Sequence, residues 1–226
     1  MTIRRSSTGR WDAAFSVECE PERLPENPHQ VGIDVGLHTF ATLSDGTAIA
    51  NSRFFRQEEQ ALAKVQRKHS RLAEGTPERR QHGKVIARVH ERIAFRCRNF
   101  THQLSRKIVN ASGFVAVEDL HVNRMVHLHC LAKSIADAAW SAFLAQLAYK
   151  AEEAGRTFVK VNPAYTSQTG SQWGHRQEMP LDQRLFECPC CHAQLDRDLN
   201  AARNIKSLGL QSVGLPLEAP AFRRGE

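Results

Sequence analysis

The chain has 226 residues, a size that suits one domain with a large insertion or two small domains. Apolar residues make up 41% of it, enough for a buried core, and a formal net charge of +7 favours a polyanionic partner. Because the sequence lacks both a run of about 18 apolar residues and an apolar stretch behind its N-terminal charges, we predict neither a transmembrane helix nor a secretory signal.

The first quarter of the chain is predicted to form strands. Asp45-Gly46 is a strong hairpin signal, because this pair favours the tight turn between two antiparallel strands. Alternating apolar and polar residues, broken by turn residues, indicate the other strands. The expected elements are a β-hairpin over residues 2–19, a proline-containing linker over 20–30, and strands that begin at Val31 and cover 40–44 and 48–55.

Residues 57–110 are predicted to form a long helical hairpin. Apolar residues recur there at steps of three and four, and Gly75-Thr76-Pro77 interrupts the pattern. Residues 53–107 hold 15 Lys and Arg but only 5 Asp and Glu, so the positive excess of the whole chain lies here. The hairpin is either a solvated helical surface or a surface that follows nucleic-acid phosphates. The candidate phosphate contacts are Lys64, Arg67, Arg71, Arg88, Arg92 and Arg96.

The second half of the chain alternates strands with helices. Gly155 and Gly209 are expected to end the two helices, because glycine is common just past a helix C-terminus. The expected elements are a strand over 114–117, a helix over 136–154, a strand over 157–161, a loop-rich segment over 163–197 and a helix over 198–208. Three consecutive strands followed by strand–helix alternation predict an α/β fold with a mixed, ribonuclease H-like sheet.

Three carboxylates stand at the ends or middles of separate predicted core elements. Asp34 interrupts an apolar strand, Glu118 ends another, and Asp198 begins a helix. Taken singly, Asp34 suits a turn, Glu118 a solvated strand end, and Asp198 a helix N-cap. Carboxylates that converge on one edge of a sheet can instead bind hard divalent cations through oxygen, and two such cations support phosphodiester cleavage.

Several motifs occur in a fixed order along the chain. They are Gly32-Ile-Asp-Val-Gly-Leu, Val117-Glu-Asp-Leu-His-Val-Asn-Arg-Met and Asp196-Arg-Asp-Leu-Asn-Ala-Ala-Arg-Asn-Ile, with Trp140 and Asn162-Pro-Ala-Tyr-Thr-Ser-Gln-Thr between the last two. Together they resemble the RuvC-like nuclease part of the TnpB/OrfB family of insertion-sequence proteins, which is similar to type V CRISPR effector nucleases. The resemblance runs from about residue 10 to about residue 206.

The resemblance implies an RNA-guided, Mg²⁺-dependent DNA endonuclease that hydrolyses phosphodiester bonds. Carried over position by position, Asp34, Glu118 and Asp198 become the catalytic residues and the ligands of two Mg²⁺ ions. The implied partners are DNA and, in intact relatives, a guide RNA, and the implied location is the cytoplasm of a prokaryotic cell. The sequence does not indicate an oligomeric state.

The zinc ribbon that the resemblance implies is altered within residues 163–197. The family's ribbon holds zinc with two Cys-x-x-Cys pairs, of which the second survives here as Cys188 and Cys191. Gly170 and Trp173 stand where the first pair is expected. Two thiolates are too few for a closed site, so we expect a degenerate ribbon without tightly bound zinc. The other candidate ligands are His175 and His192.

About 30 residues precede the first motif, whereas family members carry a substantial N-terminal half with a helical recognition part and most of a β-barrel. We therefore expect the N-terminal hairpin to be the last hairpin of that barrel, and the chain to be a truncated copy. The expected organisation is a remnant hairpin and linker over 1–30, a nuclease domain over 31–162 and 198–208 with the helical hairpin 57–110 inserted, a degenerate ribbon over 163–197 and a loose tail over 209–226.

Two other functions remain open at this point. A nucleic-acid-binding regulator without cleavage would use the basic helical hairpin alone, but it would not require the three acids. An inactive transposon remnant would explain both the short N-terminal part and the loss of paired cysteines.

Overall fold

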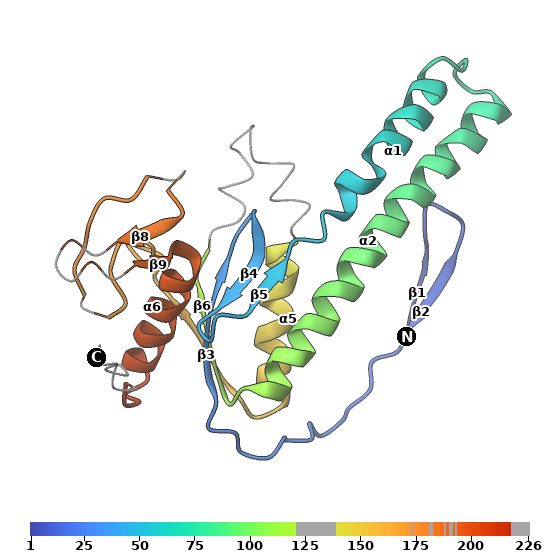
Figure 1. Ribbon diagram of the computed structural model, residues 1–226. Helices are drawn as coiled ribbons and strands as arrows, with labels where there is room; N and C mark the ends of the chain where they lie inside the picture. The colour runs from blue at the N-terminus through green and yellow to red at the C-terminus, as the bar shows by residue number, and fades with distance from the viewer. Residues whose placement is uncertain are drawn as a thin grey trace.

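A five-stranded mixed sheet forms the centre of the molecule (Figure 1). The computed structural model describes residues 1–120, 139–172, 174–180, 183–187, 189, 192 and 194–217. The strands are β3 (Gln30–Val35), β4 (Thr39–Leu43), β5 (Ala48–Ala50), β6 (Phe114–Glu118) and β7 (Thr157–Val161), in the spatial order β5-β4-β3-β6-β7. β3, β4 and β5 pair antiparallel, whereas β6 and β7 continue the sheet parallel to β3. The predicted α/β class with a mixed sheet is confirmed.

The predicted helical hairpin consists of α1 (Phe54–Ser70) and α2 (Pro77–Ala111), and it projects away from the sheet (Figure 1). Gly75 makes the turn with a φ of +78°, and the Thr76 hydroxyl caps α2 by accepting a hydrogen bond from the Arg79 N–H. The strand predicted over 48–55 was wrong at its C-terminal end. β5 stops at Ala50, and Phe54 begins α1 instead, where its ring meets the Phe100 ring edge-on.

Helices cover both faces of the sheet. The C-terminal part of α2 and α5 (Trp140–Glu153) lie on one face, and α6 (Arg197–Ser212) lies on the other (Figure 1). The main core lies under α2 and α5, where the Phe40 ring centre is 4.9 Å from that of Phe100 and 5.1 Å from that of Phe143. Buried rings from β4, α2 and α5 therefore fix these helices on the sheet.

Two glycines let α6 approach the sheet closely. A side chain at Gly32 on β3 would overlap the backbone of α6 at Ala202 and Lys206, and one at Gly209 would lie 2.6 Å from the Ala116 side chain on β6. The prediction that Gly209 ends this helix was therefore wrong. α6 continues to Ser212, because the missing side chain at Gly209 is needed for packing against the sheet. Residues 209–212, predicted as part of a loose tail, thus belong to α6, and residues 218–226 of that predicted tail lie outside the described part.

Two small antiparallel pairs flank the central sheet. β1 (Thr2–Arg5) and β2 (Trp11–Ala14) form the predicted N-terminal hairpin, which contacts α2 through Glu91. β8 (Leu185–Glu187) and β9 (Gln194–Asp196) pair within the segment that the sequence indicated only as loop-rich. Among the described helices, none is both long and apolar enough to cross a membrane.

Candidate active site

The three predicted acids occupy neighbouring elements on the α6 side of the sheet. Asp34 lies on β3, and its antiparallel partner on β4 is Thr42. Glu118 is the last residue of β6, the strand that runs parallel to β3 on its other side. Asp198 lies in the first turn of α6, the helix that packs on β3 and β6. The fold therefore brings residues from three distant parts of the chain together; we call them the acidic triad.

The buried acids of the acidic triad have perturbed pKa values. Burial raises the pKa of Asp34 well above its ordinary value, and the carboxylates of Glu118 and Asp198 raise it further. Burial also raises the pKa of Glu118, although a hydrogen bond from the Thr166 hydroxyl partly offsets this effect. Negative charge at this position is therefore costly to the folded chain unless a cation compensates it.

The structure contradicts the purely structural roles that each acid could have had by itself, namely a turn residue, a solvated strand end and a helix N-cap. Asp34 lies within a paired strand and not in a turn. Glu118 is only 8% exposed, so it is not a solvated strand end. The N-cap of α6 is Asp196, whose Oδ1 accepts hydrogen bonds from the N–H groups of Asp198 and Leu199. This cap leaves the Asp198 carboxylate available for another role.

A hydrogen-bonded loop joins Glu118 to α6. The Thr166 hydroxyl donates to Glu118 Oε1, and the Asn204 side chain on α6 donates to the Thr166 carbonyl at 2.8 Å. One turn earlier on α6, buried Asn200 donates to the Thr169 carbonyl at 2.8 Å and accepts from the Ser171 N–H at 2.8 Å. These contacts fix the second acid relative to the helix that carries the third. Sequence reasoning quoted these asparagines in a motif but assigned them no role.

Arg184, a residue that sequence reasoning missed, also reaches the acidic triad. Its Nη1 lies 3.7 Å from Asp198 Oδ1, and the Asp198 side chain is only 18% exposed. Both residues line a groove of about 320 Å³ that continues over the β4–β5 edge past His38 and Thr42. A guanidinium at this place can bind a phosphate group next to the acids. The only sequence signal was a basic residue shortly before the cysteine cluster.

The acidic triad provides an oxygen-only donor set, which suits a hard divalent cation such as Mg²⁺. The burial of these acids fits such an ion: Glu118 is only 8% exposed, and burial followed by the charges of Glu118 and Asp198 raises the pKa of Asp34, a cost that a bound cation would offset. Among the described residues, no three His, Cys, Asp or Glu side chains already converge as a ready metal cage. The three acids therefore lie on adjacent elements, but among the described residues they do not form a closed ligand set.

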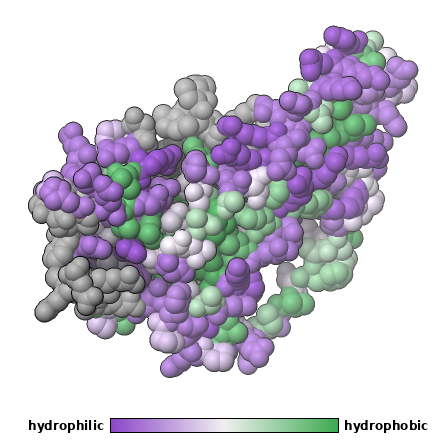
Figure 2. Space-filling view, in the orientation of Figure 1, coloured by the Kyte–Doolittle hydropathy of each residue, from purple (hydrophilic) through white to green (hydrophobic). Residues whose placement is uncertain are grey.

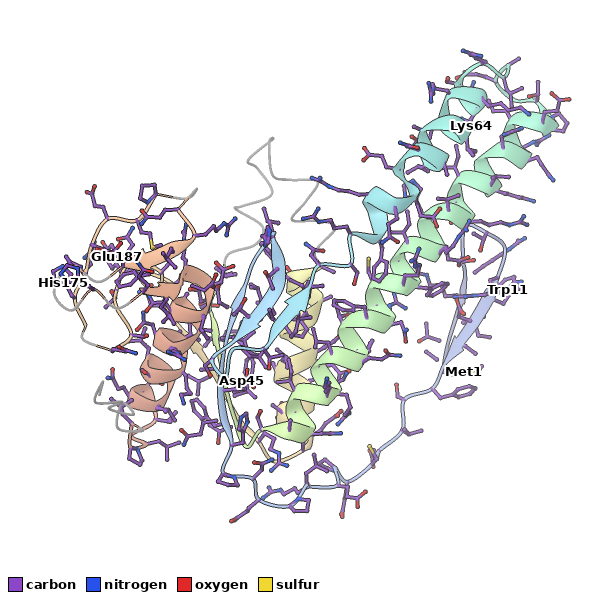
Figure 3. The ribbon with its side chains drawn as sticks, viewed as in Figure 1. Met1, Trp11, Asp45, Lys64, His175 and Glu187 are labelled. Carbon is purple, nitrogen blue, oxygen red and sulfur yellow. The ribbon has the colours of Figure 1, made fainter. Side chains whose placement is uncertain are left out.

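The ribbon region (residues 163–197) retains a compact arrangement. Cys188, Cys191 and Trp173 lie outside the described residues, so the structure does not test the zinc prediction at these positions. The loop at the expected first pair closes through hydrogen bonds from the Gly170 N–H to the His175 carbonyl and from Gly174 back to Gly170. A small apolar pair supports it: Met179 and Phe186 are both buried. His175, by contrast, lies at the surface of this region (Figure 3).

The candidate phosphate contacts on the helical hairpin fall into two groups. Arg92 and Arg96 both approach Glu58, at 3.8 and 3.6 Å, so their charge is partly compensated within the hairpin. The other four are exposed, and the described residues offer them no acidic partner: Lys64, Arg67, Arg71 and Arg88. The projecting end of the hairpin, which carries Lys64, is largely hydrophilic (Figures 2 and 3).

Comparison with known proteins relates the chain to one family of mobile-element proteins and to a group of nucleases. The family OrfB_IS605, described as "Probable transposase", matches residues 14–129, and the Cas12f1-like TNB domain matches residues 140–205. A Streptomyces pristinaespiralis protein named "Putative RNA-guided DNA endonuclease" is 37% identical over 212 residues, which cover 93% of this chain and 52% of the relative. Escherichia coli (strain K12) "Putative RNA-guided DNA endonuclease InsQ" is 32% identical over 221 residues, which cover 90% and 55%.

The fold is also found among solved structures. One of them is a cryo-EM structure of a complex of Cas12f1 with sgRNA and target DNA, and it matches with a TM-score of 0.56 at 18% sequence identity. The match covers 90% of this chain and 55% of that one. The chain thus spans about half the length of the curated relatives it matches.

Proposed function

The chain belongs to the OrfB/TnpB family of transposon-encoded proteins, and from this premise we propose that it is a Mg²⁺-dependent DNA endonuclease. Its central sheet is then a ribonuclease H-like, RuvC-type nuclease sheet, with the helical hairpin as an insertion. Asp34, Glu118 and Asp198 are its catalytic residues and metal ligands. The observation that carries the proposal is the placement of these three acids on β3, at the end of β6 and in the first turn of α6, on the side of the sheet that α6 covers. Burial raises the pKa of Asp34 there, and the Glu118 and Asp198 carboxylates raise it further.

The acidic triad would hold two Mg²⁺ ions through its carboxylate oxygens. When bound, such ions supply the Lewis acidity that activates water and stabilises the leaving oxygen in phosphodiester hydrolysis. The residues around the acids orient the carboxylates and neutralise charge on the phosphate. Thr166 fixes the Glu118 carboxylate by donating to Oε1, and Arg184 places a positive charge beside Asp198, where it can hold the phosphate to be cleaved.

The partners follow from the names of the relatives and from the charge of the helical hairpin. Proteins of the family carry names that specify RNA guidance and DNA cleavage, so we propose DNA as the substrate and a guide RNA as a partner, in the cytoplasm of a bacterial cell. Lys64, Arg67, Arg71 and Arg88 are the hairpin residues best placed to contact phosphates. The ribbon region is proposed to work without tightly bound zinc, held by Met179, Phe186 and the asparagines of α6.

Cleavage of labelled single-stranded DNA by the purified chain tests the proposal. Cleavage should require Mg²⁺, stop with EDTA, and fall at least about 100-fold in Asp34→Ala, because one carboxylate ligand is lost. Glu152→Gln, which neutralises an exposed acid on α5, is the matched control and should cleave like the wild type. Cleavage that persists in Asp34→Ala would contradict the assignment of the site.

Binding of nucleic acid without cleavage is the second candidate function. The observation in its favour is that the described acids do not yet form a ready metal cage, whereas the basic face of the helical hairpin is exposed. In that case the folded chain would bind DNA or RNA with strong salt dependence, and Asp34→Ala would leave binding unchanged.

A further inference from the structure

Tyr165 has a backbone conformation that its side chain disfavours. It lies in the loop after β7 with a φ of +67°, in the left-handed region, which a bulky L-residue rarely adopts. Its carbonyl accepts hydrogen bonds from the N–H groups of Gln168 and Thr169, both at 3.0 Å, and these bonds close the loop. Glycine would make this turn without steric cost. The turn alone therefore does not explain why an aromatic residue stands here, and strained residues of this kind gather at functional sites.

The Tyr165 ring is held from one side by a cation. The guanidinium carbon of Arg176 lies 3.2 Å from the ring centre, and the backbones of Thr169 and Arg176 form a β-bridge that keeps the two segments together. Tyr165 is nevertheless 50% exposed. An open hollow of about 600 Å³ adjoins the pair and is lined by Tyr165, Gln168, Arg176, Gln177, Glu178, Met179 and Pro180. The Arg176 guanidinium thus covers one face of the ring, while the residue as a whole remains half exposed and can contact a ligand.

The position of the ring is tied to the acidic triad. Thr166, the next residue, donates to Glu118, and its carbonyl accepts from Asn204 on α6. A group bound at Tyr165 is therefore held at a constant place relative to the acids. Arg176 adds a positive charge at the same place, which suits a ligand that carries both a flat ring and a phosphate.

We propose that Tyr165 and Arg176 form a binding site for one unpaired nucleotide of the DNA strand that is cleaved. The nucleobase stacks on the exposed part of the Tyr165 ring, and Arg176 supports the ring and attracts the adjacent phosphate. This site rests on the proposed endonuclease function, because it would position the strand whose phosphate reaches the acidic triad. Since every base offers a π-face, binding there is tolerant of base sequence.

Fluorescence anisotropy with a labelled single-stranded DNA oligonucleotide in EDTA tests the site without cleavage. Tyr165→Phe should bind like the wild type, whereas Tyr165→Ala and Tyr165→Gly should weaken binding about 10-fold, and binding to duplex DNA should change less. Tyr149→Ala, which removes the other tyrosine of the chain, is the matched control and should leave affinity unchanged. Tyr165→Gly should also melt no lower than the wild type, because glycine accepts the backbone conformation.

A second arm places a single abasic nucleotide at successive positions of the oligonucleotide. An abasic nucleotide at one of these positions should weaken binding to the wild type. At that position it should not weaken binding to Tyr165→Ala any further, since both changes remove the same stacking contact. Equal affinity of the wild type, Tyr165→Ala and Tyr165→Gly for single-stranded DNA would overturn the inference. Dependence on Tyr165 for an RNA oligonucleotide but not for DNA would also overturn it.

The two proposals fail in different ways. Mg²⁺-dependent cleavage that proceeds in Tyr165→Ala with an unchanged KM would leave the endonuclease proposal intact and remove the nucleotide site. Tyr165-dependent binding by a chain that cleaves nothing with Mg²⁺ would preserve the nucleotide site and contradict the endonuclease proposal.

Discussion

The central sheet and the ribbon region support the acidic triad by different means. Asp34 and Glu118 lie on strands whose other side faces the main core, where Phe40, Phe143 and Leu147 are almost completely buried. The ribbon region leads directly into α6 and Asp198, yet the apolar cluster among its described residues consists of Met179 and Phe186 alone. Side-chain hydrogen bonds from α6 hold much of the rest. Asp34 and Glu118 thus depend mainly on hydrophobic packing of the sheet. Asp198 depends both on the packing of α6 against β3 and β6 and on polar tethers between α6 and the loop after β7, and such tethers are more easily broken one at a time.

The same substitution in the two regions should have very different effects. Phe143→Ala removes a ring from the main core and should lower the free energy of unfolding by about 3–5 kcal/mol. Phe186→Ala should lower it by only about 1 kcal/mol, because the ribbon region can open locally without unfolding the sheet. Urea denaturation measures the first quantity, and limited proteolysis should detect faster cutting of the ribbon region in Phe186→Ala. Equal losses would mean that both regions unfold as one unit.

The close packing of α6 on β3 leaves no room for a side chain at Gly32. Gly32→Ala would overlap the α6 backbone, so we expect a loss of about 3 kcal/mol in unfolding free energy and a fall in cleavage as α6 is displaced. Gly83→Ala within α2, where an added side chain would reach only ordinary contact distance from His69, is the matched control and should stabilise the protein by about 0.5–1 kcal/mol. Thermal unfolding of both variants measures the two effects. An unchanged melting temperature in Gly32→Ala would show that β3 and α6 are not closely packed at this position.

Polar tethers can be tested at Asn204, whose amide donates to two carbonyls of the Thr166–Thr169 loop. Asn204→Ala should cost about 1–2 kcal/mol in unfolding free energy. It should lower kcat by about 10-fold in a sample that remains folded, because Glu118 and Asp198 lose their alignment. Asn99→Ala, an exposed change on α2, is the control and should alter neither quantity. Normal kcat in Asn204→Ala would show that the loop does not position the acids.

The charge of the acidic triad should weaken the metal-free fold. Asp34→Asn should raise the free energy of unfolding in EDTA at neutral pH, because it removes a carboxylate that burial and the charges of Glu118 and Asp198 destabilise. The raised pKa of Asp34 sets the sign: wild-type stability is lost as the pH rises from the ordinary pKa of aspartate to the raised pKa in the folded chain, so the difference should disappear below that range. Added Mg²⁺ should stabilise the wild type more than the variant. Denaturant titrations at several pH values measure both effects.

Local signals in the sequence predicted much of the fold correctly. Asp45-Gly46 marked the β4–β5 turn, Thr76-Pro77 the start of α2 and Gly155 the end of α5, because capping and turn residues act on their own neighbours. The prediction failed where a distant contact decides the structure. Gly209 was taken for a helix end, but the demand for close packing against Ala116 keeps it inside α6.

The acids of the candidate site were recognisable from the sequence, but their surroundings were not. An acid that interrupts or borders an apolar element can be recognised from its sequence neighbours, as with Asp34, Glu118 and Asp198. Arg184, Thr166 and Tyr165 acquire their positions only through contacts with residues far away along the chain, or through a backbone angle that the residue type does not reveal. Such residues need a three-dimensional structure to be identified.

Cleavage of labelled single-stranded DNA by the purified, folded chain, compared with Mg²⁺ and with EDTA and between the wild type and Asp34→Ala, tests the central claim most directly. We expect cutting that requires both Mg²⁺ and the Asp34 carboxylate, while Glu152→Gln cuts normally. A folded wild-type chain that leaves the DNA intact with Mg²⁺, or an Asp34→Ala variant that cuts at the wild-type rate, would contradict it.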